Sequence, residues 1–331
     1  MYISEEQVKE MDNKLLLGIG LLGLVIVGIF LVIPSQPGLF IDSKDQTIDQ
    51  SSGVPTAETS DVAGRLSHNL VLNTPAKKTV GSVIVYETIP PTVNKESTLA
   101  LAKKFNVTGT LRGDTAVQSD DLVFGVQLTK NSGCAEYMNA KRPNAIQDAP
   151  DNLPTDDEAI TIATKFLKDR DLYPEGIGDP VPKRENAYTV GKGDEIYFGQ
   201  IGVWYPRYLN GLKVEGTQLV VYVGGSGDVI GYFANWRDYT PDKEYPLISQ
   251  QDAFEQMKTE GVSVGMNEKD APVSIDTVYL AYRTKAGAYP EDYLEPVWVF
   301  KGNVTIDGKP VMAVQKSISA LSEESVKSLS E

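Results

Sequence analysis

An unbroken apolar stretch near the N-terminus constrains this chain more than any other feature. Residues 15–33 read LLLGIGLLGLVIVGIFLVI and contain no charged or strongly polar side chain. As an α-helix the stretch spans about 28 Å, close to the ~30 Å hydrocarbon core of a bilayer. Pro34 ends it. The rival interpretation is a cleaved signal peptide, but the run exceeds the usual apolar region and no A-x-A site follows. The sequence therefore predicts a retained, single transmembrane helix.

The charges beside this stretch indicate its orientation. Lys9 and Lys14 precede it and only Lys44 follows closely, which favours a cytoplasmic N-terminus and everything after Pro34 outside the cell membrane. Asn106 and Asn303 each begin an N-V-T glycosylation sequon, which is compatible with an outside location.

The composition limits the chemistry and the partners. A net charge of −14 disfavours nucleic acid as a partner. Cys134 and His68 are the only residues of their types, so a disulfide within the chain and a zinc site built from Cys and His are excluded. Neither residue has a visible catalytic partner. We therefore expect Cys134→Ser and His68→Ala to leave folding and function nearly unchanged.

Two further patterns have more ordinary interpretations. Gly18–Gly23 matches G-x-G-x-x-G, but it lies inside the apolar run, so no nucleotide cofactor is expected. Five acids gather before a predicted helix, but they form no D-x-D-x-D-G calcium loop, and acids are common at helix entrances. These acids are Asp148, Asp151, Asp156, Asp157 and Glu158. No metal site is expected.

Three helices are marked by their starting residues. Asn94 precedes a segment with Leu99, Ala102 and Phe105 at helical spacing. Thr155 to Glu158 forms a capping box, and Ser249 with Asp252 marks a third start. We expect each helix to cover one face of a sheet.

Strands dominate the remainder. Ile196–Leu209, Leu212–Val223 and Val229–Trp236 are predicted to form a central meander whose first turn is Asn210-Gly211. A second hairpin is predicted to join Val297–Ile306 to Lys309–Lys316 through Asp307-Gly308. Tight turns make neighbouring strands antiparallel, and the helices do not alternate with single strands.

These patterns predict an α+β fold with tandem units, each a helix over an antiparallel sheet. The expected organisation is a cytoplasmic tail at 1–14, the transmembrane helix at 15–33, a polar spacer at 34–66, α+β units at 67–150, 151–246 and 247–320, and a polar tail at 321–331.

Aromatic residues concentrate in the central meander. Strand packing explains most of them, yet Tyr and Trp also anchor interfaces. The candidate partner-binding residues are Trp204, Tyr205, Tyr208, Tyr222, Tyr232 and Trp236. Alternation along a strand places Trp204 and Tyr208 on one face and Tyr205 on the other. We expect one set to be core, and the other to contact an extended peptide on the free face or at an edge strand.

Three stretches resemble a known family. They are Thr155-Asp156-Asp157-Glu158-Ala159 with Ala163 and Phe166-Leu167; Arg207-Tyr208-Leu209-Asn210-Gly211 with Val214, Gly216, Leu219-Val220-Val221 and Gly227-Asp228-Val229; and Ser249–Phe254 with Tyr293–Phe300. Together they resemble PepSY-type extracytoplasmic domains and the YycH/YycI-like membrane-anchored regulators, over roughly residues 80–320. The resemblance implies helix-over-sheet units without catalysis, and a sensor kinase, or a peptidase on another chain, as the partner.

The sequence therefore predicts a non-catalytic, membrane-anchored binding or regulatory protein with a protein or peptide partner. Two alternatives stay open: a structural component of the cell envelope, and a cell-surface hydrolase that uses two of the 45 acidic side chains.

Overall fold

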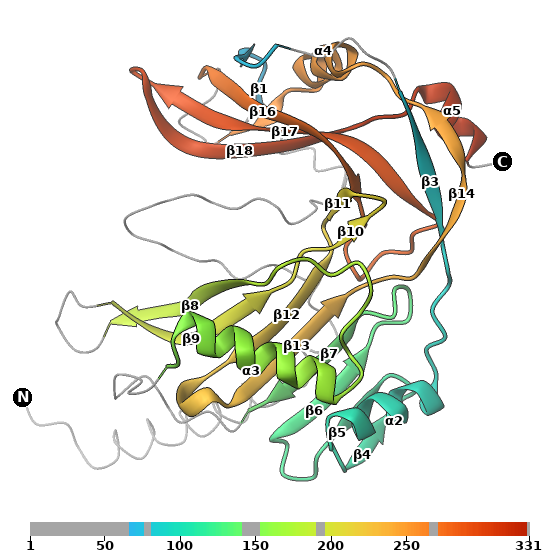
Figure 1. The fold of residues 1–331 in the computed structure, drawn as a ribbon, viewed down its shortest axis with the longest axis vertical. Helices are drawn as coiled ribbons and strands as arrows, with labels where there is room; N and C mark the ends of the chain where they lie inside the picture. Colours follow the sequence, from blue (N-terminus) through green and yellow to red (C-terminus); the bar gives the residue numbers. More distant parts are fainter. Residues whose placement is uncertain (1–65, 76–80, 141–152, 190–195, 265–270, 330–331) are drawn as a thin grey trace, which may run out of the picture. The chain divides into compact units, whose positions relative to one another are not determined.

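The computed structural model describes residues 66–75, 81–140, 153–189, 196–264 and 271–329. The expected transmembrane helix and nearly all of the expected spacer lie outside these ranges. Within them, no helix has both the length and the apolar character that crossing a bilayer requires. The described part consists mainly of strands with a few helices, which confirms the α+β class (Figure 1).

The first large sheet, called here the α3 sheet, lies under two helices. Its strands are β4 (Thr110–Arg112), β5 (Ala116–Gln118), β6 (Phe124–Leu128), β7 (Ala135–Asn139), β8 (Val181–Thr189), β9 (Ile196–Trp204), β12 (Gln218–Val223) and β13 (Val229–Asn235). Their order in the sheet is β4-β5-β6-β7-β13-β12-β9-β8, and all neighbours are antiparallel. Helix α2 (Lys95–Lys104) packs against β5 and β6, and α3 (Asp156–Asp169) against β8, β9, β12 and β13 (Figure 1).

The second large sheet, the α4 sheet, is mixed. It contains β2 (Leu70–Leu72), β3 (Ser82–Thr88), β10 (Tyr208–Leu209), β11 (Leu212–Glu215), β14 (Tyr239–Pro246), β16 (Val273–Arg283), β17 (Tyr293–Ile306) and β18 (Lys309–Ser319). The order runs β10-β11-β16-β17-β3-β14, with β18 paired to β17 and β2 paired to β16. Both β11 and β2 run parallel to β16.

Two further α-helices, one 3₁₀ turn and one short ladder complete the described fold. Helix α4 (Gln250–Glu260) packs on the α4 sheet, and α5 (Glu323–Ser328) follows β18. A 3₁₀ turn, η2 (Gly225–Gly227), links β12 to β13. Strands β1 (Leu66–Ser67) and β15 (Val262–Ser263) pair antiparallel.

All three predicted helix starts are capped as expected. The Asn94 side chain accepts from the Ser97 amide, and the Ser249 hydroxyl accepts from the Asp252 amide. At α3, the Glu158 carboxylate also accepts from the Thr155 amide at 2.9 Å, which closes the capping box. Each contact supplies a partner for a main-chain donor that the helix itself leaves unpaired.

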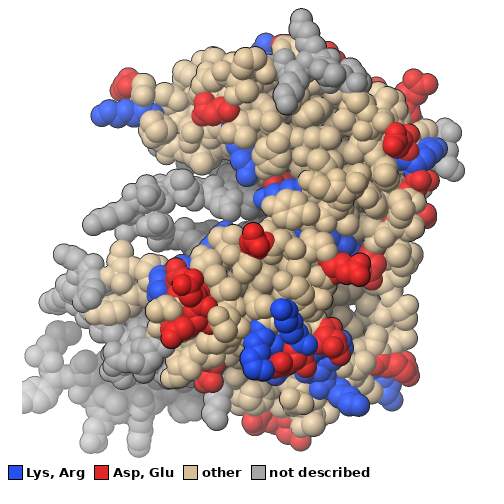
Figure 2. Space-filling view, in the orientation of Figure 1, with Lys and Arg blue, Asp and Glu red and all other residues tan. Residues whose placement is uncertain are grey.

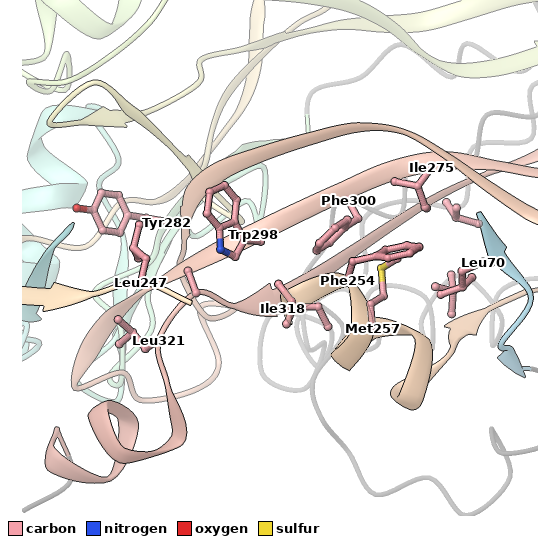
Figure 3. Close-up of a cluster of buried hydrophobic side chains, with 14 of the residues drawn as sticks. Leu70, Leu247, Phe254, Met257, Ile275, Tyr282, Trp298, Phe300, Ile318 and Leu321 are labelled. Carbon is pink, nitrogen blue, oxygen red and sulfur yellow. The ribbon is translucent and has the colours of Figure 1, made fainter. Parts of the chain in front are cut away.

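Helices α3 and α4 bury their apolar sides against their sheets. In α4, Phe254 and Met257 point toward Phe300 of β17 and Ile318 of β18 (Figure 3). In the α3 sheet, Phe166 and Leu167 join a separate cluster with apolar residues of β9 and β12. The helices therefore hold each sheet from one side by non-directional apolar packing.

The two predicted glycine turns form, but only one makes the expected long hairpin. Asp307 and Gly308 both have positive φ and connect β17 to β18, as predicted. Asn210 and Gly211 also have positive φ, yet they join only the short pair β10 and β11. Strand β9 pairs instead with β12, while β11 crosses to the α4 sheet beside β16.

Strand pairing also runs across the domain boundaries that the sequence suggests. The strands of residues 110–139 and those of residues 181–235 share the α3 sheet. Strand β3, which precedes all of them, pairs with β14 and β17 of the α4 sheet. The tandem-unit boundaries stay a prediction, and the described sheets are assembled from segments distant in the sequence.

Candidate functional site

The six predicted aromatics separate into buried and accessible groups. Tyr205 and Tyr232 are buried on the helix-covered side of the α3 sheet, whereas Tyr208 is 43% exposed. Trp204, Tyr222 and Trp236 are half-buried. Tyr205 and Tyr208 do differ in exposure, but the prediction that Trp204 and Tyr208 share one strand face is wrong. Strand β9 of the α3 sheet ends at Trp204, and Tyr208 begins β10 of the α4 sheet. The Tyr205 hydroxyl lies 2.9 Å from that of Thr164, and burial raises the pKa of Tyr205 to about 12.

Trp204 has a specific partner on its own sheet. Its indole nitrogen donates to Oε1 of Glu185 at 2.7 Å, and Gln200 donates to the other oxygen at 3.2 Å. Burial raises the pKa of the Glu185 carboxyl, although both hydrogen bonds oppose that rise. The arrangement fixes the Trp204 ring in one orientation.

The strands of the meander lie inside the α3 sheet. Strand β9 is flanked by β8 and β12, and β13 by β12 and β7. These strands therefore cannot accept an added peptide strand, because their main-chain groups already pair on both sides. The two-residue β10 is the part of the predicted meander that ends a sheet. The edge-binding form of the prediction is wrong for β9, β12 and β13.

Two of the predicted aromatics line a hollow at the end of α3. The hollow has a volume of about 220 Å³. Its lining comprises Ala135, Leu219, Tyr232 and Ala234 from the sheet, Gly133 and Trp236 just beyond its strands, and Asp171, Leu172, Tyr173 and Pro174 from the loop after α3. The exposed Tyr173 ring meets the buried Tyr205 ring edge-on, with 6.4 Å between centroids. Exposed and buried aromatics are thus in direct contact here.

Arg207 supports the Trp236 wall of this hollow. Its guanidinium lies 4.8 Å from the Trp236 ring centroid and 4.9 Å from that of Tyr239, and it donates to the Arg237 carbonyl at 2.6 Å. Arg207 is only 5% exposed. Cation–π contacts of a desolvated guanidinium are worth roughly 2 kcal/mol, so Trp236 is held in place by a strong local contact.

Behind Arg207 lies a buried polar cluster that we call the Arg237–Glu291 cluster. Arg237 donates to the carbonyls of Lys285, Ala286 and Tyr289, and to that of Asn131. Glu291 accepts from the hydroxyls of Tyr239 and Thr284 and from the Lys285 amide.

Inside this cluster, Arg237 Nε lies 3.7 Å from Glu291 Oε1, and both side chains are 1% exposed. Burial, followed by the charge of Glu291, raises the pKa of the Tyr239 hydroxyl. The hydroxyl therefore stays protonated and donates its hydrogen bond.

His68 and Cys134 belong to the residue types most often associated with catalysis, but their surroundings here suit a structural role. His68 is exposed, and its Nδ1 lies 2.9 Å from the Lys258 carbonyl, a partner that the sequence did not suggest. Cys134 is 3% exposed, and burial raises the pKa of its thiol. A thiol that stays protonated is a poor nucleophile. Serine would bury a hydroxyl in place of the thiol, and a buried hydroxyl costs free energy unless it gains a hydrogen bond. We therefore expect Cys134→Ser to destabilise the fold, contrary to the expectation from sequence.

The acidic entrance of α3 is described from Asp156 onward. Asp156 pairs with Arg184 at 3.0 Å, and Glu158 serves in the capping box. Asp148 and Asp151 lie outside the described ranges. Among the residues that the structure describes, no group of three His, Cys, Asp or Glu side chains is arranged to hold a metal ion.

The two sequons differ in their surroundings. Asn106 is exposed just after α2, with a φ of 57°. Asn303 is half-buried within β17 and lies between Ser274 of β16 and Ala313 of β18. A folded protein therefore presents Asn106 more openly than Asn303.

Sequence reasoning missed Tyr173, Asp171 and Arg207. Arg207 was noted only as part of the family-like stretch, and nothing in the sequence indicates its two aromatic neighbours. For Tyr173 a partial signal was present, because a residue directly before proline favours an extended backbone, which places Tyr173 in the loop after the helix. Figure 2 shows acidic and basic side chains interspersed on the face that it displays.

Comparisons with known proteins give similarity at the level of structure alone. No family model matches the chain, and no curated protein matches it. An uncharacterized protein from Eubacterium rectale is 11% identical, with a TM-score of 0.47, over 77% of this chain and 89% of that one. The Bacillus megaterium YpeB C-terminal domain is 16% identical, with a TM-score of 0.30, over 69% and 92%.

YycH from Bacillus subtilis is also similar. It is 11% identical, with a TM-score of 0.37, over 72% of this chain and 53% of YycH, so this chain spans about half of YycH. YycH is one of the proteins named in the sequence resemblance, and the resemblance to PepSY domains stays a prediction. Identities and TM-scores this low do not establish a shared function.

Proposed function

We propose that this chain is a non-catalytic protein, anchored in the cell membrane by residues 15–33, that recognises a protein or peptide partner outside the cell. The hollow formed by Tyr173, Trp236 and Tyr232 is the observation that carries the binding role. Aromatic rings supply large contact areas at low entropic cost, and they dominate interface energetics. A sensor kinase, or a peptidase on another chain, is the partner class that the family resemblance implies.

The size of the hollow sets the kind of contact. A volume of about 220 Å³ holds one large apolar side chain and is smaller than most cofactor pockets, which enclose roughly 300–1,000 Å³. Of its lining residues, Leu219, Ala234 and Tyr232 are buried, whereas Tyr173 is exposed and Trp236 half-buried, so we take the last two as its rim. We therefore propose that one side chain of the partner inserts here, while neighbouring parts of the partner contact the rim.

A site-specific photo-crosslinker tests this proposal in the full chain. Placed at Tyr173, it should capture the partner in native membranes. Placed at Leu122, a comparably accessible apolar residue at 51% exposure, it should not. Competition by excess unlabelled chain should remove the Tyr173 product. Equal products from the two positions, or none from Tyr173, would contradict the assignment of this hollow.

The membrane topology is tested separately. Protease added to intact cells should remove the region after residue 34 and leave residues 1–33 with the membrane. If removal requires permeabilised cells, the proposed orientation is wrong, whatever the crosslinking result.

A further inference from the structure

Strand β18 ends the α4 sheet and offers a long row of main-chain groups. In the described residues β18 pairs only with β17, over Lys309–Ser319, and the chain beyond it meets Leu247 and Ile248. The Ala320 amide donates to the Pro296 carbonyl, which fixes the hydrogen-bonding phase of the β17–β18 ladder. Counting back from Ala320, every second residue of β18 bonds to β17. The residues between them direct their N–H and C=O groups away from β17.

The outward-directed residues are small or uncharged: Val311, Ala313, Gln315, Ser317 and Ser319. Their main-chain groups have no strand partner among the described residues. The nearest charged side chain within this stretch, Lys316, belongs to the opposite phase and pairs with Glu260 at 2.8 Å. The edge is therefore neutral along its whole length from Val311 to Ser319.

Other edges in the described sheets carry features that prevent pairing. Strand β8 contains Pro182, Lys183 and Arg184, and a positive φ at Asn186 interrupts it. Strand β14 contains Pro241 and Pro246, with a register shift after Pro241. The edges β2, β4 and β10 are only two or three residues long. Proline, charge, bulges and shortness are the usual protections of an edge strand. In β18 the register shift against β17 lies at Val311, next to Pro310, and the ladder is regular from Met312 to Ser319.

We propose that β18 pairs antiparallel with β18 of a second copy of this chain. Such an edge is self-complementary, because each outward residue offers one donor and one acceptor, and a two-fold axis places the same surface on both partners. Full overlap of Val311–Ser319 places the axis at Gln315. Ala313 then faces Ser317, and Val311 faces Ser319, so no two like charges are opposed.

The lack of charge along this edge suits pairing with an identical edge better than pairing with a basic partner strand. A neutral edge with Lys316 already paired to Glu260 gives a basic segment nothing to neutralise. The net charge of −14 makes two copies repel at long range, and salt screens that repulsion. Association through β18 should therefore strengthen as ionic strength rises. The proposal does not depend on the Tyr173 hollow, and either can fail alone.

Disulfide trapping in the full chain tests the pairing and its register. Antiparallel residues that exchange both hydrogen bonds have Cα atoms about 5.5 Å apart, within disulfide range. Gln315→Cys should therefore give a disulfide-linked dimer under mild oxidation. In Ser319→Cys the two thiols lie eight strand positions apart, on the order of 26 Å, so this matched control should stay monomeric. The native Cys134 is buried and gives no background.

A mixed sample completes the test. Ser319→Cys chains combined with Val311→Cys chains should cross-link, although neither does so alone. Thr240→Cys lies on β14, the edge strand that contains two prolines and a register shift, and it should give no dimer at all. A monomeric Gln315→Cys chain, equal trapping of Ser319→Cys, or a product containing a different protein would each overturn the proposal.

Discussion

The Arg237–Glu291 cluster offers a sharp test of how buried charge stabilises this fold. Replacing Arg237 by Met keeps the apolar stem but removes the donor to four carbonyls and leaves Glu291 without a counter-charge. Breaking a fully buried pair in this way costs about 3–5 kcal/mol of the free energy of unfolding. Glu291→Gln should cost less, about 1–2 kcal/mol, because Tyr239 and Thr284 can still donate to the amide oxygen and Arg237 keeps its carbonyls.

The double variant distinguishes this reasoning from simple loss of packing. With both charges gone, Arg237→Met combined with Glu291→Gln should be no less stable than Arg237→Met alone, although the two single losses sum to more. Urea unfolding of the full chain, followed by circular dichroism, measures all three values. If Arg237→Met costs less than about 1 kcal/mol, or if the double loss equals the sum of the single losses, the charge-pair argument is refuted.

Four further outcomes follow from burial and capping. Tyr205→Ala should cost about 3–5 kcal/mol in unfolding free energy, whereas Tyr208→Ala should barely change the melting temperature, since the two differ so much in exposure. Burial raises the pKa of Glu185, so the folded state holds that proton longer than the unfolded chain. Its contribution to stability is then lost as pH rises above the ordinary value of 4.5, and Glu185→Gln should remove that loss in melting curves taken across this range. Cys134→Ser should lower thermal stability more than Cys134→Ala, because only serine buries an added hydroxyl. Thr155→Ala should cost about 1 kcal/mol in urea unfolding, because it removes the α3 capping box.

Local signals in the sequence were reliable because their physics is local. Asn94, Thr155 and Ser249 each accept a hydrogen bond within three residues, so the residue type alone predicts the helix start. The positive φ values at Asn210 and Asp307 likewise follow from residues that tolerate that conformation next to glycine. These features need no knowledge of the rest of the fold.

Strand partners were predicted less well, because pairing depends on residues distant in the sequence. Periodicity indicates that residues 212–223 are extended, but not that Val214 lies beside Tyr282 while Val220 lies beside Trp204. The candidate site shows the same limit. Two aromatics of the hollow were predicted from composition, whereas Arg207 acquires its role only where Trp236 and Tyr239 come together on either side of it.

The position of β3 has a consequence for the order in which the chain acquires its structure. Thr88 ends β3, yet its partners are β14 and Tyr293 at the start of β17, with the whole α3 sheet encoded between them. At roughly 5–20 residues per second, synthesis from Thr88 to Tyr293 takes about 10–40 s. The α3 sheet can collapse within that interval, while β3 stays unpaired because β14 and β17 have not yet been synthesised. The nascent chain therefore carries an unpaired strand during its synthesis, and chaperones that shield extended segments have the longest opportunity to act there.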